Sequence, residues 1–184
     1  RFLMSSPSSS RGPATAARLN NPVDVDIGPD GRIYIADRDN DVIRMVENSF
    51  IFTVAGNGTA GYSGDGGNAF LAQLRSPRGV TVDSQNNILI SDFSNHVIRH
   101  VDAGTRIIQT IAGTGGIFGF AGDGGPAAAA LLDNPRCTAL DASGNLYIAD
   151  AGNNRVRRVF GAGTGSGVVI GSGGGGGSTG GGAP

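Results

Sequence analysis

Hydrophobic and polar residues alternate along several short stretches of the chain. In the first stretch Val23, Val25 and Ile27 alternate with Asp24 and Asp26. A period of two places neighbouring side chains on opposite faces of an extended backbone, so the pattern predicts a β-strand. Turn-forming residues follow, and similar stretches recur along the chain. Besides the strand at 23–27, we expect strands at 32–37, 41–46 and 51–55, at 87–92, 97–101 and 107–112, and at 145–150, 155–160 and 168–170.

One longer pattern repeats three times. Each copy begins at a proline, reaches an aspartate 15 residues later and an arginine 7 residues after that. The prolines are Pro22, Pro77 and Pro135, so consecutive copies are 55 and 58 residues apart. Self-similarity at this scale is typical of propellers and solenoids, and four short strands per copy make a propeller blade. We therefore predict an all-β fold of about three four-stranded blades, a partial or open propeller.

The residues that recur in every copy are interpreted as scaffold. A structural role is needed in each blade, whereas chemistry is needed once, so we favour this interpretation over a metal site lined by the three aspartates. The scaffold residues are Asp37, Asn40 and Arg44 in the first copy, Asp92, Asn95 and Arg99 in the second, and Asp150, Asn153 and Arg157 in the third.

A glycine-rich module connects the copies. It reads Gly-Asp-Gly-Gly around Asp65 and again around Asp123, and each loop leads into an alanine-rich stretch that favours a short helical turn. Such loops can bind Ca²⁺, but one carboxylate is few for a cation that takes six to eight oxygens. We expect these aspartates to cap turns, and we expect no cofactor, with calcium at Asp65 or Asp123 as the alternative.

The repeats divide the chain into segments. Three blades do not close a ring, so we expect other copies or chains to complete or stack the propeller. The expected segments are a Ser/Pro-rich lead at 1–10, the tail of a preceding blade at 11–21, blades at 22–76, 77–134 and 135–171, and a glycine-rich tail at 172–184.

Composition narrows the possible partners. The 184 residues carry a formal net charge of −1, so no overall field attracts nucleic acid or an anionic membrane. No apolar stretch reaches the length of a membrane-spanning helix. Cys137 is the only cysteine, so the chain forms no internal disulfide. Asn57-Gly58-Thr59 is a glycosylation sequon, which together with the Ser/Pro-rich lead favours an extracellular or cell-surface location and possible contacts with glycans.

The pattern resembles the NHL repeat, which is named for an Asn-His-Leu triplet after the aspartate. The triplets here are Asn40-Asp41-Val42, Asn95-His96-Val97 and Asn153-Asn154-Arg155. The resemblance covers about residues 11–171 and implies a propeller, usually of about six blades, that serves as an interaction platform. Some members are enzymes with metals in the central channel, and some bind RNA through a basic face.

We therefore expect a non-enzymatic structural or protein-interaction module in a larger extracellular assembly, without nucleic acid as a partner. The alternatives are a fragment of a metal-dependent lyase or lactonase, and an RNA-binding domain. We predict no catalytic residues, since no Ser-His-Asp arrangement is visible. His96 and His100, four apart on an expected strand, would be about 13 Å apart, too far to bind one metal ion.

Four residues are candidates for contacts with a partner. Asp24 and Asp26 occur only in the first copy, which makes them candidates, although we favour a solvated face of the terminal blade as their explanation. Arg155 and Arg158 belong, with Arg157, to the only dense basic cluster. Aromatic residues make up 6% of the chain and tryptophan is absent, so there are few platforms for stacking RNA bases.

Overall fold

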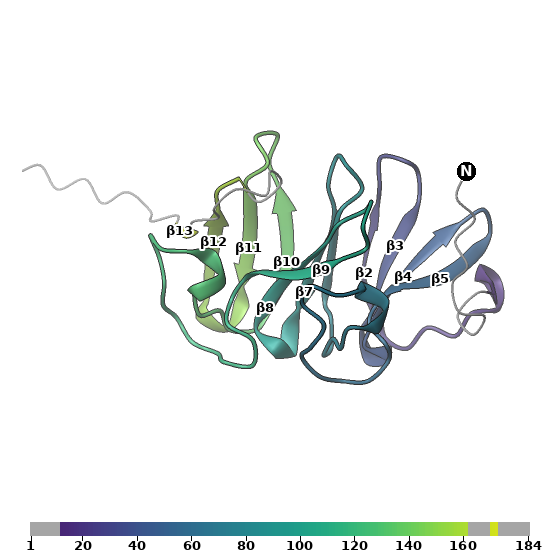
Figure 1. Ribbon diagram of the computed structural model, residues 1–184, viewed down its shortest axis with the longest axis horizontal. Helices are drawn as coiled ribbons and strands as arrows, with labels where there is room; N and C mark the ends of the chain where they lie inside the picture. The colour runs from purple at the N-terminus through teal and green to yellow at the C-terminus, as the bar shows by residue number, and fades with distance from the viewer. Residues whose placement is uncertain (1–11, 162–169, 173–184) are drawn as a thin grey trace, which may run out of the picture.

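The computed structural model describes residues 12–161 and 170–172 and consists of three antiparallel sheets that stand side by side along the longest axis (Figure 1). Each sheet corresponds to one copy of the repeat, which confirms the predicted open, all-β propeller arc. The lead segment 1–10, Arg11 and residues 173–184 of the predicted glycine-rich tail lie outside the described residues.

The strands of each sheet follow one another in sequence order, from the inner strand to the outer one. Short turns that contain glycine or asparagine connect consecutive strands within blades 1 and 2, and connect β10 to β11 and β11 to β12 in blade 3. Blade 1 contains β2 (Pro22–Ile27), β3 (Ile33–Asp37), β4 (Val42–Glu47) and β5 (Phe50–Ala55), blade 2 contains β6 (Gly79–Val82), β7 (Ile88–Asp92), β8 (Val97–Val101) and β9 (Ile108–Ala112), and blade 3 contains β10 (Pro135–Leu140), β11 (Leu146–Asp150), β12 (Arg155–Val159) and β13 (Ile170–Ser172). Of the expected fourth strand of blade 3 at 168–170, only Ile170 is among the described residues, and it is the first residue of β13.

The chain before blade 1 adds a fifth strand to its sheet. β1 (Gly12–Pro13) pairs antiparallel with β5, with Gly12 opposite Ile51 and Pro13 opposite Phe50. The corresponding Asn68 forms an isolated bridge to Ile107, beside the outer strand of blade 2. The first two connecting modules thus dock beside the outer strand of the blade that follows them.

The alanine-rich stretches form the expected helical turns as single 3₁₀ turns, η1 (Ala14–Ala16), η3 (Ala69–Leu71) and η5 (Ala127–Ala129). In the two later modules the first alanine of the turn, the alanine three residues later and the following leucine are buried, namely Ala69, Ala72 and Leu74, and Ala127, Ala130 and Leu132. None of the helical elements in the described part of the chain is long and apolar enough to span a lipid bilayer.

The hydrophobic core lies between the blades rather than inside one sheet. One cluster joins Tyr34 and Ile43 of blade 1 to Ile88 and Ile90 of blade 2. A second joins Leu89 and Ile98 of blade 2 to Leu146 and Ile148 of blade 3. Because successive side chains of a strand point to opposite faces, blade 2 contributes alternate residues of β7 to the two clusters.

Candidate functional site

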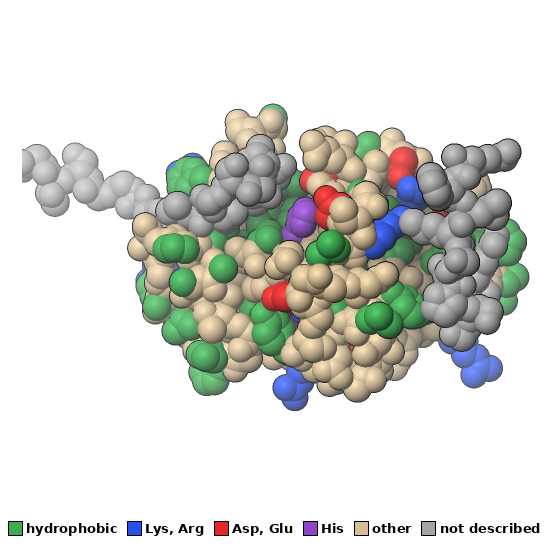
Figure 2. Space-filling view, viewed as in Figure 1, with side chains coloured by type: hydrophobic (Ala, Val, Ile, Leu, Met, Phe, Trp, Pro, Cys, Tyr) green, Lys and Arg blue, Asp and Glu red, His purple; other side chains and the backbone are tan. Residues whose placement is uncertain are grey.

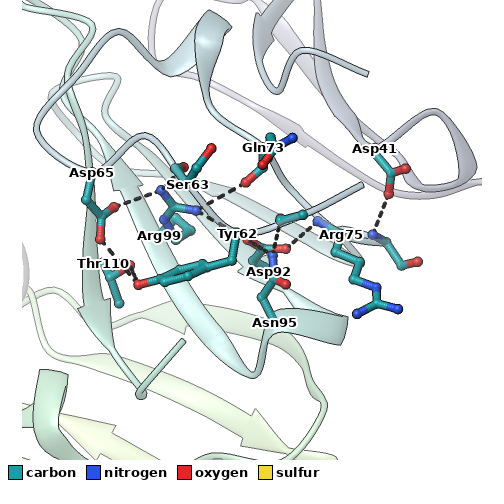
Figure 3. A network of polar contacts seen from close by, with 12 residues as sticks. Asp41, Tyr62, Ser63, Asp65, Gln73, Arg75, Asp92, Asn95, Arg99 and Thr110 are labelled. Carbon is teal, nitrogen blue, oxygen red and sulfur yellow. Dashed lines mark hydrogen bonds and ion pairs between the residues drawn. The ribbon is translucent and has the colours of Figure 1, made fainter. Parts of the chain in front are cut away.

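A network of polar side chains surrounds the signature arginine of blade 2 (Figure 3). Arg99 and Asp92 are fully buried. The Arg99 guanidinium lies 3.4 Å from an Asp92 oxygen and 2.7 Å from an oxygen of Asp65, and it donates to the Ser63 carbonyl. A buried arginine needs such partners, because an unpaired charge in the interior is costly.

Asp92 is bound from three sides. Its carboxylate accepts hydrogen bonds from the Arg75 backbone N–H, the Asn95 amide and the Arg99 guanidinium. Asn95 also donates to the Gly61 carbonyl at 2.7 Å. Burial raises the pKa of Asp92 to about 6, although the hydrogen bonds and the charge of Arg99 act in the opposite direction.

Blade 3 repeats this arrangement. Arg157 is fully buried, forms ion pairs with Asp123 and Asp150, and donates to the Ala121 carbonyl. Asn153 donates to the Gly119 carbonyl and to Asp150. The loop of the preceding module therefore packs on the arginine in both blades, and its aspartate supplies the second carboxylate.

Blade 1 differs at the same position. Asp37 accepts from the Asn20 backbone N–H and from Asn40, as its counterparts do. Arg44, however, is only half-buried and donates to the Thr53 hydroxyl, and among the described residues no carboxylate lies within ion-pair distance of it. The described chain leaves this arginine without the loop that covers its two counterparts.

The blades are also connected through the residue that follows the signature asparagine. Asp41 and His96 both have left-handed backbone conformations, with φ of 54° and 59°. Asp41 accepts from the Ser76 backbone N–H at 2.7 Å, and His96 Nδ1 accepts from the Asn134 backbone N–H at 3.1 Å. Each side chain thus holds the segment that enters the next blade. His96 precedes β8 instead of lying in it, so the expectation that both histidines lie on one strand is wrong.

Comparison with known proteins agrees with the repeat architecture. A family model described as "NHL repeat" matches residues 19–41, 74–100 and 132–159, which contain the three signatures. The chain carries three NHL repeats.

The chain is similar in sequence to a longer plant protein, and its fold is similar to part of two longer solved structures. The chain is 29% identical over 150 residues to Protein SUPPRESSOR OF QUENCHING 1, chloroplastic, of Arabidopsis thaliana, which covers 75% of this chain and 14% of the relative. It resembles a Bacteroides thetaiotaomicron protein of unknown function with a TM-score of 0.68 and 22% sequence identity. The match covers 78% of this chain and 36% of that protein. It also resembles virginiamycin B lyase of Staphylococcus aureus with a TM-score of 0.52 and 13% sequence identity. The match covers 85% of this chain and 42% of the lyase. The chain therefore spans well under half the length of each.

The candidate interaction residues Asp24 and Asp26 of the first NHL repeat face the second one. Asp24 accepts from the Val80 backbone N–H at 2.9 Å, and Asp26 accepts from the Val82 backbone N–H at 2.8 Å. The favoured explanation, a solvated terminal face, is therefore wrong for these two side chains. They bind the inner strand of blade 2, which lies 56 residues further along the chain.

The basic cluster of the third NHL repeat is divided in space. Arg157 is fully buried and Arg155 is exposed, although both guanidinium groups lie over the Phe120 ring, at 4.9 Å and 4.3 Å. Arg158 lies on the opposite face of β12 and stacks on Phe160 at 4.0 Å. The three charges therefore do not form one basic surface.

The remaining candidates lie in the connecting modules of the NHL repeats. Asp65 and Asp123, the candidate calcium ligands, each contact the signature arginine of the next blade. Among the described residues, no group of three or more His, Cys, Asp or Glu side chains is placed to hold a metal ion. Asn57 of the sequon is exposed, and its amide donates to the Leu71 carbonyl at 3.3 Å.

Sequence reasoning missed Asp41, His96 and Tyr62 as connecting residues. The Tyr62 hydroxyl bonds to the Thr110 hydroxyl at 2.8 Å, and its ring lies over Arg99. The available signal was positional, because Asp41 and His96 occupy the middle of the NHL triplet. Because the residue at this position differs between the copies, the sequence did not indicate that both side chains bind the segment entering the next blade. That role requires only a hydrogen-bond acceptor.

Proposed function

We propose that the chain is a non-enzymatic structural or protein-interaction module, and that further blades complete its propeller within a larger extracellular assembly. The proposal rests on the two end faces of the arc. Residues on these faces are exposed, whereas the equivalent residues of the other blades are buried where two blades meet. Protein surfaces that leave apolar groups uncovered in this way are sites of association.

The exposure of equivalent residues carries this argument. Val25 of blade 1 is 60% exposed, whereas its counterpart Val80, three residues after the proline of blade 2, is 3% exposed. At the other end Val156 is 59% exposed, whereas its counterparts Ile43 and Ile98 are fully buried. Figure 2 likewise shows hydrophobic side chains at the surface at the end that holds the third sheet. Both ends therefore present the face that blades use to pack on one another.

Light scattering of the full 184-residue chain tests the proposal. We expect self-association, because in the absence of further blades the exposed end faces of separate copies cover each other. Val25→Asp and Val156→Asp should reduce it. Leu71→Asp is the matched control, since Leu71 is 68% exposed but lies in a connecting module instead of on an end face. A wild-type chain that remains a monodisperse monomer would contradict the proposal.

A fragment of a metal-dependent lyase is the second candidate, because the chain shares its fold with virginiamycin B lyase. Against it, the signature aspartates contact backbone N–H groups and neighbouring side chains, as a scaffold requires. Metal analysis after dialysis, combined with lyase and lactonase assays, separates the two. Bound zinc at one equivalent per chain together with turnover would favour the enzyme.

The extracellular location and glycosylation rest on the exposed Asn57 sequon. Expression in a secreting eukaryotic host should yield a chain whose mass falls on treatment with peptide N-glycosidase. The Asn57→Gln variant should have the lower mass from the start. A wild-type chain that is secreted without a glycan would argue against this part of the proposal.

A further inference from the structure

A cavity of about 690 Å³ lies beside the signature arginine of blade 1. Asn40, Arg44 and Thr53 contribute its polar wall, and Ala17, Ile51 and Phe70 contribute apolar atoms. Asp39 also borders it, but its carboxylate is bound by Arg38 and by the Asn21 amide. The cavity therefore presents an arginine with no carboxylate among the described residues to neutralise it.

The two other blades show what occupies the equivalent space. In blade 2 the loop 61–67 brings Asp65 to Arg99, and the carbonyl of Gly61 to Asn95. In blade 3 the loop 119–125 brings Asp123 to Arg157, and the carbonyl of Gly119 to Asn153. In both blades, therefore, the signature asparagine and arginine bind a glycine-rich loop of the same kind.

The side chains at this position make different contacts in blade 1 and in blade 2. In blade 2 the Thr110 hydroxyl, opposite Arg99 in the sheet, bonds to Tyr62 of the loop. In blade 1 Thr53 is opposite Arg44, and its hydroxyl accepts from Arg44 instead. A threonine and an arginine that contact a loop in blade 2 thus contact each other in blade 1.

We propose that the cavity at Arg44 is the receptor for a glycine-rich peptide loop that carries one aspartate and belongs to a propeller blade other than the three described. Ser10 stands 34 residues before Arg44, where Asp65 and Asp123 stand before Arg99 and Arg157, so this chain has no carboxylate at that position. A second copy is not the source, because its two such loops are docked on its own arginines.

The loop must have glycine on both sides of the aspartate. Gly64 and Gly122 have φ of 95° and 89°, and Gly66 and Gly124 have φ of 79° and 81°. Positive φ is strained for residues with a side chain. A Cβ on Gly64 would also lie 2.6 Å from the Cβ of Ala72, and Ala17, the counterpart of Ala72, lines the cavity. A guanidinium then binds the carboxylate strongly and with fixed geometry.

This inference rests on the proposed function, and a peptide tests it separately. The probe is a fluorescent peptide with the sequence of residues 61–69, blocked at both ends, titrated against the full chain carrying Val25→Asp to suppress assembly. We expect saturable one-to-one binding by anisotropy. Asp65→Asn in the peptide should weaken it at least about tenfold, since charge-assisted hydrogen bonds are among the strong ones.

Changes in the chain sharpen the test. Arg44→Gln should weaken binding of the original peptide by a similar factor, and it should leave the affinity for the Asp65→Asn peptide nearly unchanged. Arg158→Gln is the matched control, because Arg158 is a half-buried arginine at the other end of the arc. Gly64→Ala in the peptide should remove binding.

Three outcomes would overturn the inference. These are equal affinity for the aspartate and asparagine peptides, insensitivity to Arg44→Gln, and displacement of the peptide by inorganic phosphate at equimolar concentration. The peptide variants need no refolding of the chain, so they remain decisive if Arg44→Gln unfolds. A chain that self-associates but fails to bind the peptide overturns this inference alone, and a monomeric chain that binds the peptide overturns only the proposed assembly.

Discussion

Blade 1 and blade 2 share a signature and a strand order, but blade 2 is enclosed by neighbours on both sides and blade 1 is not. In blade 2 the arginine is fully buried between two carboxylates, and in blade 1 it is half-buried and bonds to a threonine. The sequence motif alone therefore does not define the ion-pair network. The preceding loop completes it.

The inner strands of the two blades also use different chemistry towards the next blade. β2 reaches β6 with the carboxylates of Asp24 and Asp26. At the equivalent positions β6 has Gly79 and Thr81. A Cβ on Gly79 would lie 2.7 Å from the Arg136 carbonyl oxygen, and Thr81 bonds to Thr138. Carboxylates therefore connect β2 to β6, whereas a glycine in van der Waals contact and a pair of threonines connect β6 to β10.

The first prediction concerns the two signature aspartates and has the largest expected effect. Asp92→Ala should lower the free energy of unfolding by about 3–5 kcal/mol, because it leaves the buried Arg99 without one of its two carboxylates. Asp37→Ala should lower the free energy of unfolding by less, about 1–3 kcal/mol. It removes the acceptor of two hydrogen bonds, from the Asn20 backbone N–H and the Asn40 amide, but it leaves no buried arginine unpaired. Urea unfolding of both variants measures the difference. Equal losses would show that blade 1 and blade 2 use the same network.

The second prediction concerns the close approach of blades 2 and 3. Gly79→Ala should lower the free energy of unfolding by about 1–3 kcal/mol, because the added methyl group would overlap backbone atoms that cannot rotate away. Gly12→Ala in β1 is the matched control, since a Cβ there meets no atom within 4 Å. Thermal unfolding followed by circular dichroism compares the two. A Gly79→Ala variant as stable as the wild type would mean that the backbone at Arg136 and Cys137 can move away from position 79.

The sequence predicted the elements well, because the repeat and the alternation of side chains are local signals. Turn residues and β-branched strands recur at fixed spacing, and the observed strands follow them within one or two residues. The targets of Asp24 and Asp26 could not be predicted in this way, since they lie 56 residues away in another blade. Arg157 shows the same difficulty. Its sequence neighbours suggest a basic surface, but carboxylates from elsewhere in the chain allow it to be buried.

The last prediction is the pH dependence that burial gives to Asp92. Its pKa in the folded chain is about 6, above the ordinary value of 3.8, so the folded state holds the proton more tightly than the unfolded chain does. The resulting stabilisation is fully present below about pH 4 and is lost as the pH rises through 6. Asp92→Asn keeps the shape and cannot titrate. The free energy of unfolding of the wild type, relative to this variant, should therefore fall between pH 4 and 6 and remain constant above pH 7. Urea unfolding across this range measures it, and a difference that is flat from pH 4 to 8 would mean that Arg99 and the hydrogen bonds of blade 2 keep the carboxylate ionised despite its burial.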